Sequence, residues 1–463
     1  MSDELREECG VYGIFRDPEA LRLTYQGLFS LQHRGQEAAG LAYLKDGDIV
    51  LHKGPGLVTE ALRLRDLPQG VDTAIGHVRY STQGPSTPDN VQPLLARTRF
   101  GPLALGHNGT LTNQRVLKEE LEGHGAVFQS TSDSEVLAHL IAHAAAPTLT
   151  GAVEAAVRRL EGGFAYLVLT RSSMLGVRDP HGIRPLVLGE LGGHFILASE
   201  TCALDATGGR FIREVEPGEM VVVDEHGVQS IRLWDAADHP PAFCSFEMVY
   251  FARPDSVFRG VGVHDARRAL GRELAREHPV QADVVVGVPD SSTPAAMGYS
   301  EVAGIPLDLG LVKNRYVGRT FIQPEAGMRE SGVSAKLSAV RSVVRDRDIV
   351  LVDDSLVRGT TSRHIVQLLR QAGAKSVHMR IASPPYRRPC HYGIDTSRIE
   401  ELAAARWDVE ETRRRVGADS LQYLSEEGLE RALGPGGWCM ACFGRPYPVP
   451  VDVETEESHA ARR

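Results

Sequence analysis

A buried strand that ends in two acidic residues and runs into a hydroxyl-rich loop is the feature that most constrains this chain. Residues 349–362 read Ile-Val-Leu-Val-Asp-Asp-Ser-Leu-Val-Arg-Gly-Thr-Thr-Ser. Four consecutive apolar residues predict a strand covered on both faces, as in a parallel sheet flanked by helices. Ligands of open α/β sheets bind at the carboxyl ends of the strands, so Asp353 and Asp354 are expected at a ligand site.

The loop that follows these acids has the chemistry of a phosphate site. Gly359 allows the backbone to approach closely, and the amides and hydroxyls of the next three residues can surround a phosphate at a helix N-terminus. The two carboxylates suit ribose hydroxyls or a divalent cation instead. An isolated Asp-Asp pair could simply cap a strand end, but the complete string of 14 residues disfavours that alternative.

This string resembles the phosphoribosyl-pyrophosphate (PRPP) signature of type I phosphoribosyltransferases. Residues 286–292 resemble their pyrophosphate loop, and residues 313–324 resemble the mobile lid of the glutamine PRPP amidotransferase family. Lys and Arg in that lid could neutralise a departing pyrophosphate, although a solvated basic loop is the alternative for this segment alone. The resemblance implies that PRPP contacts Asp290, Ser291, Ser292, Lys313, Arg315, Lys336, Asp353, Asp354, Ser355, Arg358, Gly359, Thr360, Thr361 and Ser362.

The same resemblance implies one Mg²⁺ per subunit, held by Ser291, Asp353 and Asp354. Magnesium retains several waters and uses few protein carboxylates together with substrate phosphates, which fits so small a set of acids. The chain departs from the family at residues 332–337, Gly-Val-Ser-Ala-Lys-Leu, where Ser334 stands in place of a usual basic residue. That leaves one phosphate or nucleotide contact in question, but not the fold.

Five short motifs in the first half, taken together, indicate a nucleophile. Cys9 lies in Glu-Cys-Gly-Val-Tyr-Gly-Ile, and residues 32–37, 76–82, 106–110 and 132–135 follow in order. Alone, Cys9 could be a buried core residue. In order, the five motifs resemble class II glutamine amidotransferases, which use an N-terminal cysteine. A free α-amino group has a pKa of about 7.7–8.0 and can serve as the base, so residues 1–8 are predicted to be a propeptide.

The amidotransferase resemblance also implies roles for the other motif residues. Asn108 and the amide of Gly109 would form an oxyanion hole. Arg79 would pair with the α-carboxylate of glutamine, because a guanidinium suits bidentate binding, and Asp133 would hold its α-ammonium. The region around Arg34 and Gly35 would line the site. The motif histidines, His77 and His107, are expected to be packed or hydrogen-bonded rather than acid–base groups.

Four of the six cysteines form a candidate metal centre: Cys244, Cys390, Cys439 and Cys442. Four thiolates can complete a zinc site or a [4Fe–4S] cluster, and their spacing does not choose between the two. A lone CxxC could also be a redox pair. Residues 244–256 and 388–395 resemble the iron–sulfur-containing branch of the amidotransferase family, which implies a structural [4Fe–4S] cluster. Cys202 is expected to be a buried side chain.

The two halves of the chain differ in pattern. Short apolar runs broken by glycine-rich turns, with helical stretches at 134–145 and 151–160, predict layered α+β structure in the first half. In the second half, apolar runs at 284–288, 305–311, 349–352 and 377–381 alternate with helical patterns, which indicates a parallel sheet. The resemblances imply a four-layer αββα N-terminal-nucleophile (Ntn) domain at 9–236 and a type I phosphoribosyltransferase domain with a cluster-binding segment at 237–463.

Composition narrows the function classes. The 463 residues carry a net charge of −9, so a general nucleic-acid binder is not expected. Mean hydropathy is −0.18 and no run of 18 apolar residues occurs, so no membrane span is expected. The acidic N-terminus does not resemble a signal peptide. The predicted location is the cytoplasm, where a disulfide framework is not expected.

Together, the resemblances imply a glutamine-dependent enzyme of purine biosynthesis. Glutamine, PRPP and water would give 5-phosphoribosylamine, glutamate and pyrophosphate, with ammonia passing internally between two sites. Similarity also implies purine-nucleotide inhibitors and a homotetramer. Three alternatives are another class II glutamine amidotransferase, a nonenzymatic PRPP-sensing regulator, and a catalytically silent scaffold with structural zinc. The loop at 353–361 argues against the first, and the intact glutaminase motifs argue against the sensor.

Overall fold

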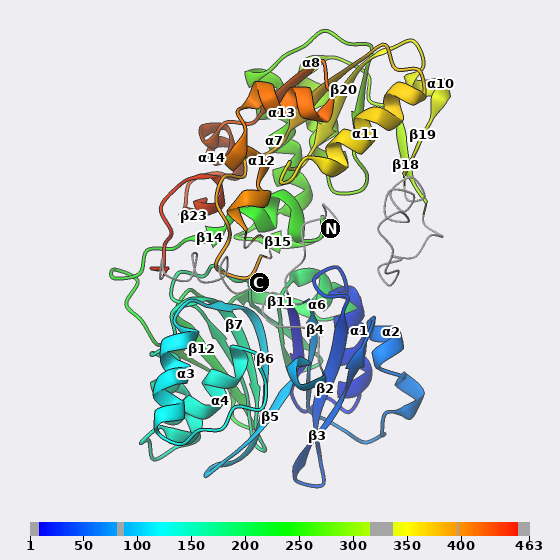
Figure 1. Ribbon diagram of the computed structural model, residues 1–463. Helices are drawn as coiled ribbons and strands as arrows, with labels where there is room; N and C mark the ends of the chain where they lie inside the picture. Colours follow the sequence, from blue (N-terminus) through cyan, green and yellow to red (C-terminus); the bar gives the residue numbers. More distant parts are fainter. Residues whose placement is uncertain (1–8, 81–87, 315–336, 395, 397, 452–463) are drawn as a thin grey trace.

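The computed structural model describes residues 9–80, 88–314, 337–394, 396 and 398–451. The predicted propeptide, Arg315, Lys336 and Ser334, and most of the predicted lid lie outside these residues. Two stacked antiparallel sheets form the lower part of the view in Figure 1, and a parallel sheet with its helices forms the upper part. Among the described residues, no helix has both the length and the apolar character needed to cross a membrane.

The first half folds into two antiparallel sheets that share a core. The seven-stranded sheet has the order β11 (Arg210–Glu214), β9 (Val187–Leu191), β10 (His194–Ala198), β1 (Gly10–Ile14), β4 (Ala74–Arg79), β2 (Ala38–Lys45) and β3 (Asp48–Pro55). The six-stranded sheet has the order β13 (Gly227–Arg232), β12 (Glu219–Asp224), β8 (Met174–Arg178), β7 (Gly162–Leu169), β6 (Gly101–Leu111) and β5 (Leu94–Thr98). Val11 and Leu197 of the first sheet belong to the same buried cluster as Leu167 and Val221 of the second.

Helices cover the outer face of each sheet. On the seven-stranded sheet lie α1 (Ala20–Ser30), α2 (Val58–Ala61) and α6 (Thr201–Thr207), and on the six-stranded sheet lie α3 (Gln114–Gly123), α4 (Ser134–His143) and α5 (Leu149–Val157). Alternation along β1 explains how one strand serves two cores: Val11 joins the cluster between the sheets, whereas Tyr12 and Ile14 join the cluster under α1 and α6. The predicted four-layer αββα fold is confirmed.

The second half contains the predicted parallel sheet, in the order β17 (Val284–Gly287), β20 (Asp348–Asp353), β21 (Ser376–Ile381) and β22 (Ser420–Tyr423). Its apolar residues alternate between two cores. Val285 and Val350 pack under α7 (Val263–Glu277), α8 (Thr293–Ala303) and α14 (Glu426–Leu433). Val286 and Leu351 pack under α11 (Thr360–Gln371) and α13 (Val409–Val416), with α10 (Arg341–Val344) and α12 (Ala403–Arg406) at the margin of this core.

One predicted strand does not form as expected. Within residues 305–311, Leu307 makes only an isolated bridge to Val285, and the chain then enters the hairpin of β18 (Leu311–Lys313) and β19 (Leu337–Ala339). Pro306 accepts a hydrogen bond from the Val285 N–H at 2.9 Å but has no N–H to donate, so a regular ladder cannot continue there.

Two short pairings join distant segments of the second half. β14 (Phe243–Cys244) runs parallel to β23 (Trp438–Cys439), with Cys244 opposite Cys439 in register. The hairpin of β15 (Val257–Phe258) and β16 (Val261–Gly262) lies nearby in sequence. The β14–β23 pairing returns the C-terminal segment to the start of the second half, and so brings two of the predicted cluster cysteines side by side.

Close contact between α7 and α8 depends on two glycines. A Cβ at Gly298 would lie 1.9 Å from the carbonyl oxygen of Arg268, and one at Gly271 would lie 1.8 Å from that of Ala295. Because backbone atoms cannot move aside like a side chain, we expect Gly298→Ala to lower the free energy of unfolding by about 1–3 kcal/mol, measured by urea denaturation.

Gly123→Ala is the matched control, because a Cβ there meets nothing within 4 Å at the end of α3. It should leave stability unchanged or raise it by up to about 1 kcal/mol. Equal effects of the two substitutions would contradict the close helix contact.

Candidate active site and cysteine cavity

Cys9 lies immediately before β1, a strand in the middle of the seven-stranded sheet, and its side chain is buried. Its thiol donates to the Tyr80 carbonyl at 3.6 Å, and its own carbonyl accepts from Nε of Arg34 at 3.1 Å. The nucleophile predicted from the sequence is therefore held on a rigid element, with an arginine from a neighbouring loop fixing its backbone.

Asn108 and Gly109 occupy β6 of the other sheet, next to β7. Asn108 is fully buried, and among the described residues neither its Oδ1 nor its Nδ2 has a hydrogen-bond partner. Gly109 has φ of +133°, and a Cβ there would lie 2.0 Å from the carbonyl oxygen of Gly163. Since buried polar groups are nearly always paired, an amide left unpaired beside a glycine-only position indicates a ligand site.

Asp133 is the buried carboxylate at the start of α4. Its Oδ2 accepts the Leu111 N–H at 2.9 Å, and its Oδ1 is 3.6 Å from Nδ1 of His107, whose ring stacks on Tyr166. Burial acts to raise the pKa of Asp133, but His107 and the Leu111 N–H together lower it by more. The pKa of Asp133 therefore falls below its usual value. An ionised Asp133 has the charge needed to bind an ammonium group.

Arg79 and Gly35 lie together at the end of β4. Arg79 is the last residue of that strand and is buried. A Cβ at Gly35 would lie 2.6 Å from the backbone nitrogen of Arg79, so the loop after α1 can rest on β4 only with a glycine at this position. Arg34, Gly35 and Arg79 therefore lie close together.

Arg34 also joins the two halves of the chain. Its guanidinium, 1% exposed, donates to Glu200 at 2.5 Å and to Glu247 at 2.6 and 2.9 Å. Glu200 precedes α6, whereas Glu247 comes from the second half of the chain. The sequence analysis assigned no role to Glu200, Glu247 or Arg184, which also forms an ion pair with Glu247. A charged residue among apolar neighbours was the only sequence signal that could have pointed to them.

The two motif histidines are packed and hydrogen-bonded. His77 is fully buried and its Nε2 lies 2.9 Å from the carbonyl oxygen of His107. Burial lowers the pKa of His77 to about 3, so its ring is neutral near pH 7. This environment suits the packing role expected for it.

The predicted PRPP residues gather at the carboxyl ends of β17 and β20. Ser292, which caps α8, donates to Oδ1 of Asp353 at 2.9 Å and to Oδ2 of Asp354 at 3.1 Å. Ser291 and Ser355 both donate to Asp354, at 2.5 and 2.8 Å. The parallel pairing of β17 with β20 thus brings together two motifs that are about sixty residues apart.

The predicted phosphate loop leads directly into α11. Gly359 caps the helix at φ of +86°, and Thr360, Thr361 and Ser362 form its first turn. Lys313 reaches the same edge, with Nζ 3.3 Å from Oδ2 of Asp290. Arg358, by contrast, pairs with Glu401 at 2.7 Å in this structure.

The acid pair fits a magnesium ion by its donor set. Burial raises the pKa of Asp354, although three serine hydroxyls donate to its carboxylate or lie against it and act to lower the pKa. A hard cation would offset the cost of a buried negative charge, and carboxylate and hydroxyl oxygens are the ligands that Mg²⁺ uses.

The four predicted cluster cysteines line one cavity, together with Ile183, Arg184, Tyr392, Ile394, Ala441 and Tyr447. Burial raises the pKa of Cys439 to about 12 and that of Cys442 well above its usual value. Ionised thiols here therefore need compensating positive charge, which a metal centre supplies. Among the described residues, no group of three or more His, Cys, Asp or Glu is arranged to hold a metal ion as it stands, and none of the six cysteines is in a disulfide.

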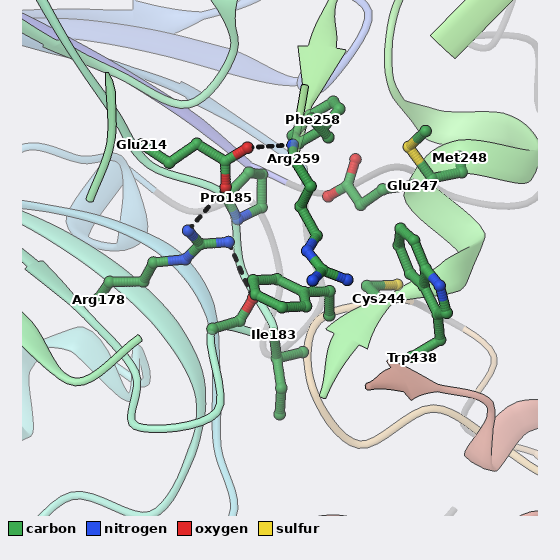
Figure 2. Close-up of a pocket in the computed structure, with 12 residues that line it drawn as sticks. Arg178, Ile183, Pro185, Glu214, Cys244, Glu247, Met248, Phe258, Arg259 and Trp438 are labelled. Carbon is green, nitrogen blue, oxygen red and sulfur yellow. Dashed lines mark hydrogen bonds and ion pairs between the residues drawn. The ribbon is translucent and has the colours of Figure 1, made fainter. Parts of the chain in front are cut away.

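A second cavity adjoins the first at Cys244 and Ile183. Figure 2 shows Arg259 crossing it between Glu214, Glu247 and Trp438. Its guanidinium lies over the ring of Phe243, 4.4 Å from the centroid, and its backbone N–H donates to Glu214. The hairpin that carries Arg259 therefore covers this side of the cysteine region.

Both halves match known domain families. Residues 77–206 match a model described as a glutamine amidotransferase domain, and residues 263–390 match a model described as a phosphoribosyl transferase domain.

Relatives match nearly the whole chain. The amidophosphoribosyltransferase of Bacillus subtilis (strain 168) is 50% identical over an alignment that covers 98% of this chain and 97% of that protein. The amidophosphoribosyltransferase of Synechococcus elongatus is 46% identical and covers 98% of this chain and 94% of its own length.

Two solved structures are similar over 96% of this chain at 50% identity. One, described as the allosteric regulatory enzyme of purine biosynthesis, matches with a TM-score of 0.92 over 97% of its chain. The other is glutamine PRPP amidotransferase from B. subtilis complexed with ADP and GMP, with a TM-score of 0.90 over 98% of its chain.

The serine that bridges the two acids provides a test of the ligand site. Ser292→Ala removes a hydroxyl that donates to both carboxylates and accepts the Asp354 N–H at 2.9 Å. We expect magnesium-dependent PRPP binding, measured by calorimetry, to weaken roughly tenfold or more, since unmet buried groups cost about 1–3 kcal/mol.

Ser300→Ala is the control, because this serine lies on the same helix and donates to the Ile305 carbonyl away from the acids. Comparable losses of affinity in both variants would contradict a local role for Ser292.

Proposed function

The chain belongs to the amidophosphoribosyltransferase family, and from that membership we propose which of its residues carry the activity. It is an enzyme with a glutamine amidotransferase part and a phosphoribosyltransferase part, and it serves purine biosynthesis. We propose that glutamine and PRPP are its substrates, as the printed name of the B. subtilis structure indicates for that relative. The domains would span residues 9–236 and 237–463, and residues 1–8 would be removed.

Glutamine hydrolysis is assigned to Cys9. Its sulfur attacks the side-chain amide carbon, the carbonyl oxygen takes negative charge, and ammonia leaves; water then cleaves the thioester to give glutamate. The α-amino group freed by loss of residues 1–8 takes and returns the proton. The observation that carries this assignment is the buried, unpaired amide of Asn108 beside the N–H of Gly109, which suits a developing oxyanion.

Substrate recognition follows from two buried charges. Arg79 has the fork geometry for the α-carboxylate of glutamine. Asp133, whose pKa is lowered, has the charge for the α-ammonium. The packing of Gly35 against β4 supports a site walled by the loop after α1.

Phosphoribosyl transfer is assigned to the carboxyl edge of the parallel sheet. Ammonia attacks C1 of PRPP, the bond from C1 to the pyrophosphate oxygen breaks, and 5-phosphoribosylamine and pyrophosphate result. The 5-phosphate would lie on the loop that opens α11, the ribose hydroxyls near Asp353 and Asp354, and the pyrophosphate near Ser291 and Lys313. Bound Mg²⁺, held by the acid pair, would neutralise the leaving group.

The four cysteines are proposed to hold a [4Fe–4S] cluster. Their shared cavity and the register pairing of Cys244 with Cys439 support a common ligand. A cluster bound there would supply structural cross-linking between the C-terminal segment and the rest of the chain. Spacing and burial are compatible with zinc as well, which metal content distinguishes.

Regulation by purine nucleotides is proposed for this chain too, since the B. subtilis relative was solved with ADP and GMP. The homotetramer and the cytoplasmic location remain predictions from the family resemblance.

Replacing the nucleophile should separate the two reactions. Cys9→Ala is expected to abolish glutamine-dependent formation of 5-phosphoribosylamine, because no other described thiol lies in this site. Activity with free ammonia should persist within about twofold, since the second site needs only the nucleophile that ammonia itself provides. Pyrophosphate release with each nitrogen donor is the measurement, and loss of both activities would contradict separable sites.

Metal content tests the cysteine assignment. Anaerobically prepared protein should contain about four iron atoms and four acid-labile sulfides per chain. Cys390→Ser should lower both strongly, whereas Cys202→Ser, a buried cysteine outside the cavity, should leave them unchanged. One zinc atom per chain and no iron would overturn the cluster proposal.

A further inference from the structure

Two buried carboxylates, one from each half of the molecule, accept hydrogen bonds from residues of the other half. Glu200 of the first half accepts the backbone N–H of Arg253 at 3.0 Å and the hydroxyl of Ser256 at 2.7 Å, both from the second half. Glu247 of the second half accepts from Arg34 and Arg184 of the first. The second half therefore supplies two hydrogen bonds to Glu200, and the first half supplies the two arginines that neutralise Glu247.

Both oxygens of Glu247 are committed to Arg34. Oε1 accepts from Nη2 at 2.6 Å and Oε2 accepts from Nη1 at 2.9 Å, and the side chains are 4% and 1% exposed. This bidentate geometry fixes the plane of the guanidinium, which a single contact would not do.

The backbone around Glu247 is itself anchored. Arg267 of α7 donates to the carbonyls of Met248, Tyr250 and Ala252, at 2.9, 2.7 and 2.8 Å. The short helix that begins at Glu247 is thus attached to the core of the second half. The position of the carboxylate follows the second half rather than the first.

The third nitrogen of Arg34 reaches the nucleophile. Nε donates to the carbonyl oxygen of Cys9 at 3.1 Å, so one planar group joins Cys9 to Glu247. If the guanidinium turned or shifted, the Cys9 backbone would lose this bond, and its sulfur would change position relative to β6.

A second buried link runs from the same carboxylate toward the cysteine cavity. Arg184 lies 3.5 Å from Oε1 of Glu247 and donates from Nε to the Tyr392 carbonyl at 2.7 Å. The next residue, Gly393, packs against Gly109, with its Cβ position 3.2 Å from the Gly109 Cα. Figure 2 shows Glu247 facing the cavity that Cys244 also lines.

We propose that Glu247 is a positioning residue of the glutaminase site. Through Arg34 it holds the backbone of Cys9 in the position from which the sulfur attacks the amide of glutamine. This rests on the proposed role of Cys9 as nucleophile. It makes glutamine hydrolysis dependent on docking of the second half, although Glu247 touches neither substrate nor reacting atom.

Glu247→Gln tests this role in the full-length enzyme. The amide keeps the size of the side chain but places an N–H₂ against an Arg34 N–H and removes the charge. We expect kcat for glutamine hydrolysis to fall about 10–100-fold while KM changes less than about threefold, because a shift of about 1 Å at a reacting group can cost that much. Ammonia-dependent synthesis should stay within about twofold, and Glu247→Asp should restore part of kcat.

Glu219→Gln is the matched control, since Glu219 is also buried and pairs with an arginine, Arg213, at 2.7 and 2.8 Å, but is not connected to Cys9 by these contacts. An active control beside unchanged glutamine kcat in Glu247→Gln would overturn the positioning role. Equal loss of both activities in Glu247→Gln would overturn it as well, since the effect would then be general.

If Glu247→Gln does not fold, Glu247→Asp replaces it, because the shorter side chain keeps the charge but cannot hold both Arg34 nitrogens from the same backbone position. Glutamine kcat equal to that of the wild type in this variant would overturn the proposal. If a wild-type chain that begins at Cys9 released no glutamate, the proposed function itself would be overturned. That result is distinct from failure of the positioning role, in which the wild-type chain still releases glutamate.

Discussion

The structure depends on two buried carboxylates, Glu200 and Glu247, that accept hydrogen bonds across the interface between the domains. A buried ion pair adds little net stability over an apolar pair, but removal of one partner costs about 3–5 kcal/mol. Separation of the halves would leave Glu247 without Arg34 and Arg184, and Glu200 without its hydrogen bonds from Arg253 and Ser256. His33 and Arg34, both of the first half, lower the pKa of Glu200 against the opposing effect of burial, so the charge of Glu200 is compensated within its own half.

The interface also explains why the two chemical sites lie where they do. Cys9 lies immediately before a central strand of the seven-stranded sheet, and the loop that fixes its carbonyl faces the second half. The parallel sheet carries its acids and hydroxyls at its carboxyl edge, as strand geometry requires. The segment with Cys390, Tyr392 and Gly393 packs against β6 and β7, so the cysteine cavity lies at the junction of the two bodies rather than at a remote surface.

Sequence patterns predicted the layers and the local motifs, because both depend on short-range chemistry. The apolar run at 349–352 and the acids that follow it specified a buried strand and its functional end, and Gly109 is needed where φ is +133°. The strand predicted at 305–311 does not form because Pro306 has no N–H to donate, and a prediction based on apolar residues alone does not take this into account. Glu200 and Glu247 were not predicted, because Arg34, their common partner, lies more than 160 residues before each of them in the sequence. No rule of sequence spacing reveals a contact at that separation.

Glutamate release from glutamine, measured on anaerobically prepared enzyme with and without PRPP and Mg²⁺, tests the coupling of these halves most directly. We expect PRPP with Mg²⁺ to raise the rate about tenfold or more, within the range usual for coupled sites. A rate indifferent to PRPP would contradict the account, because the interface would then join two sites that do not communicate.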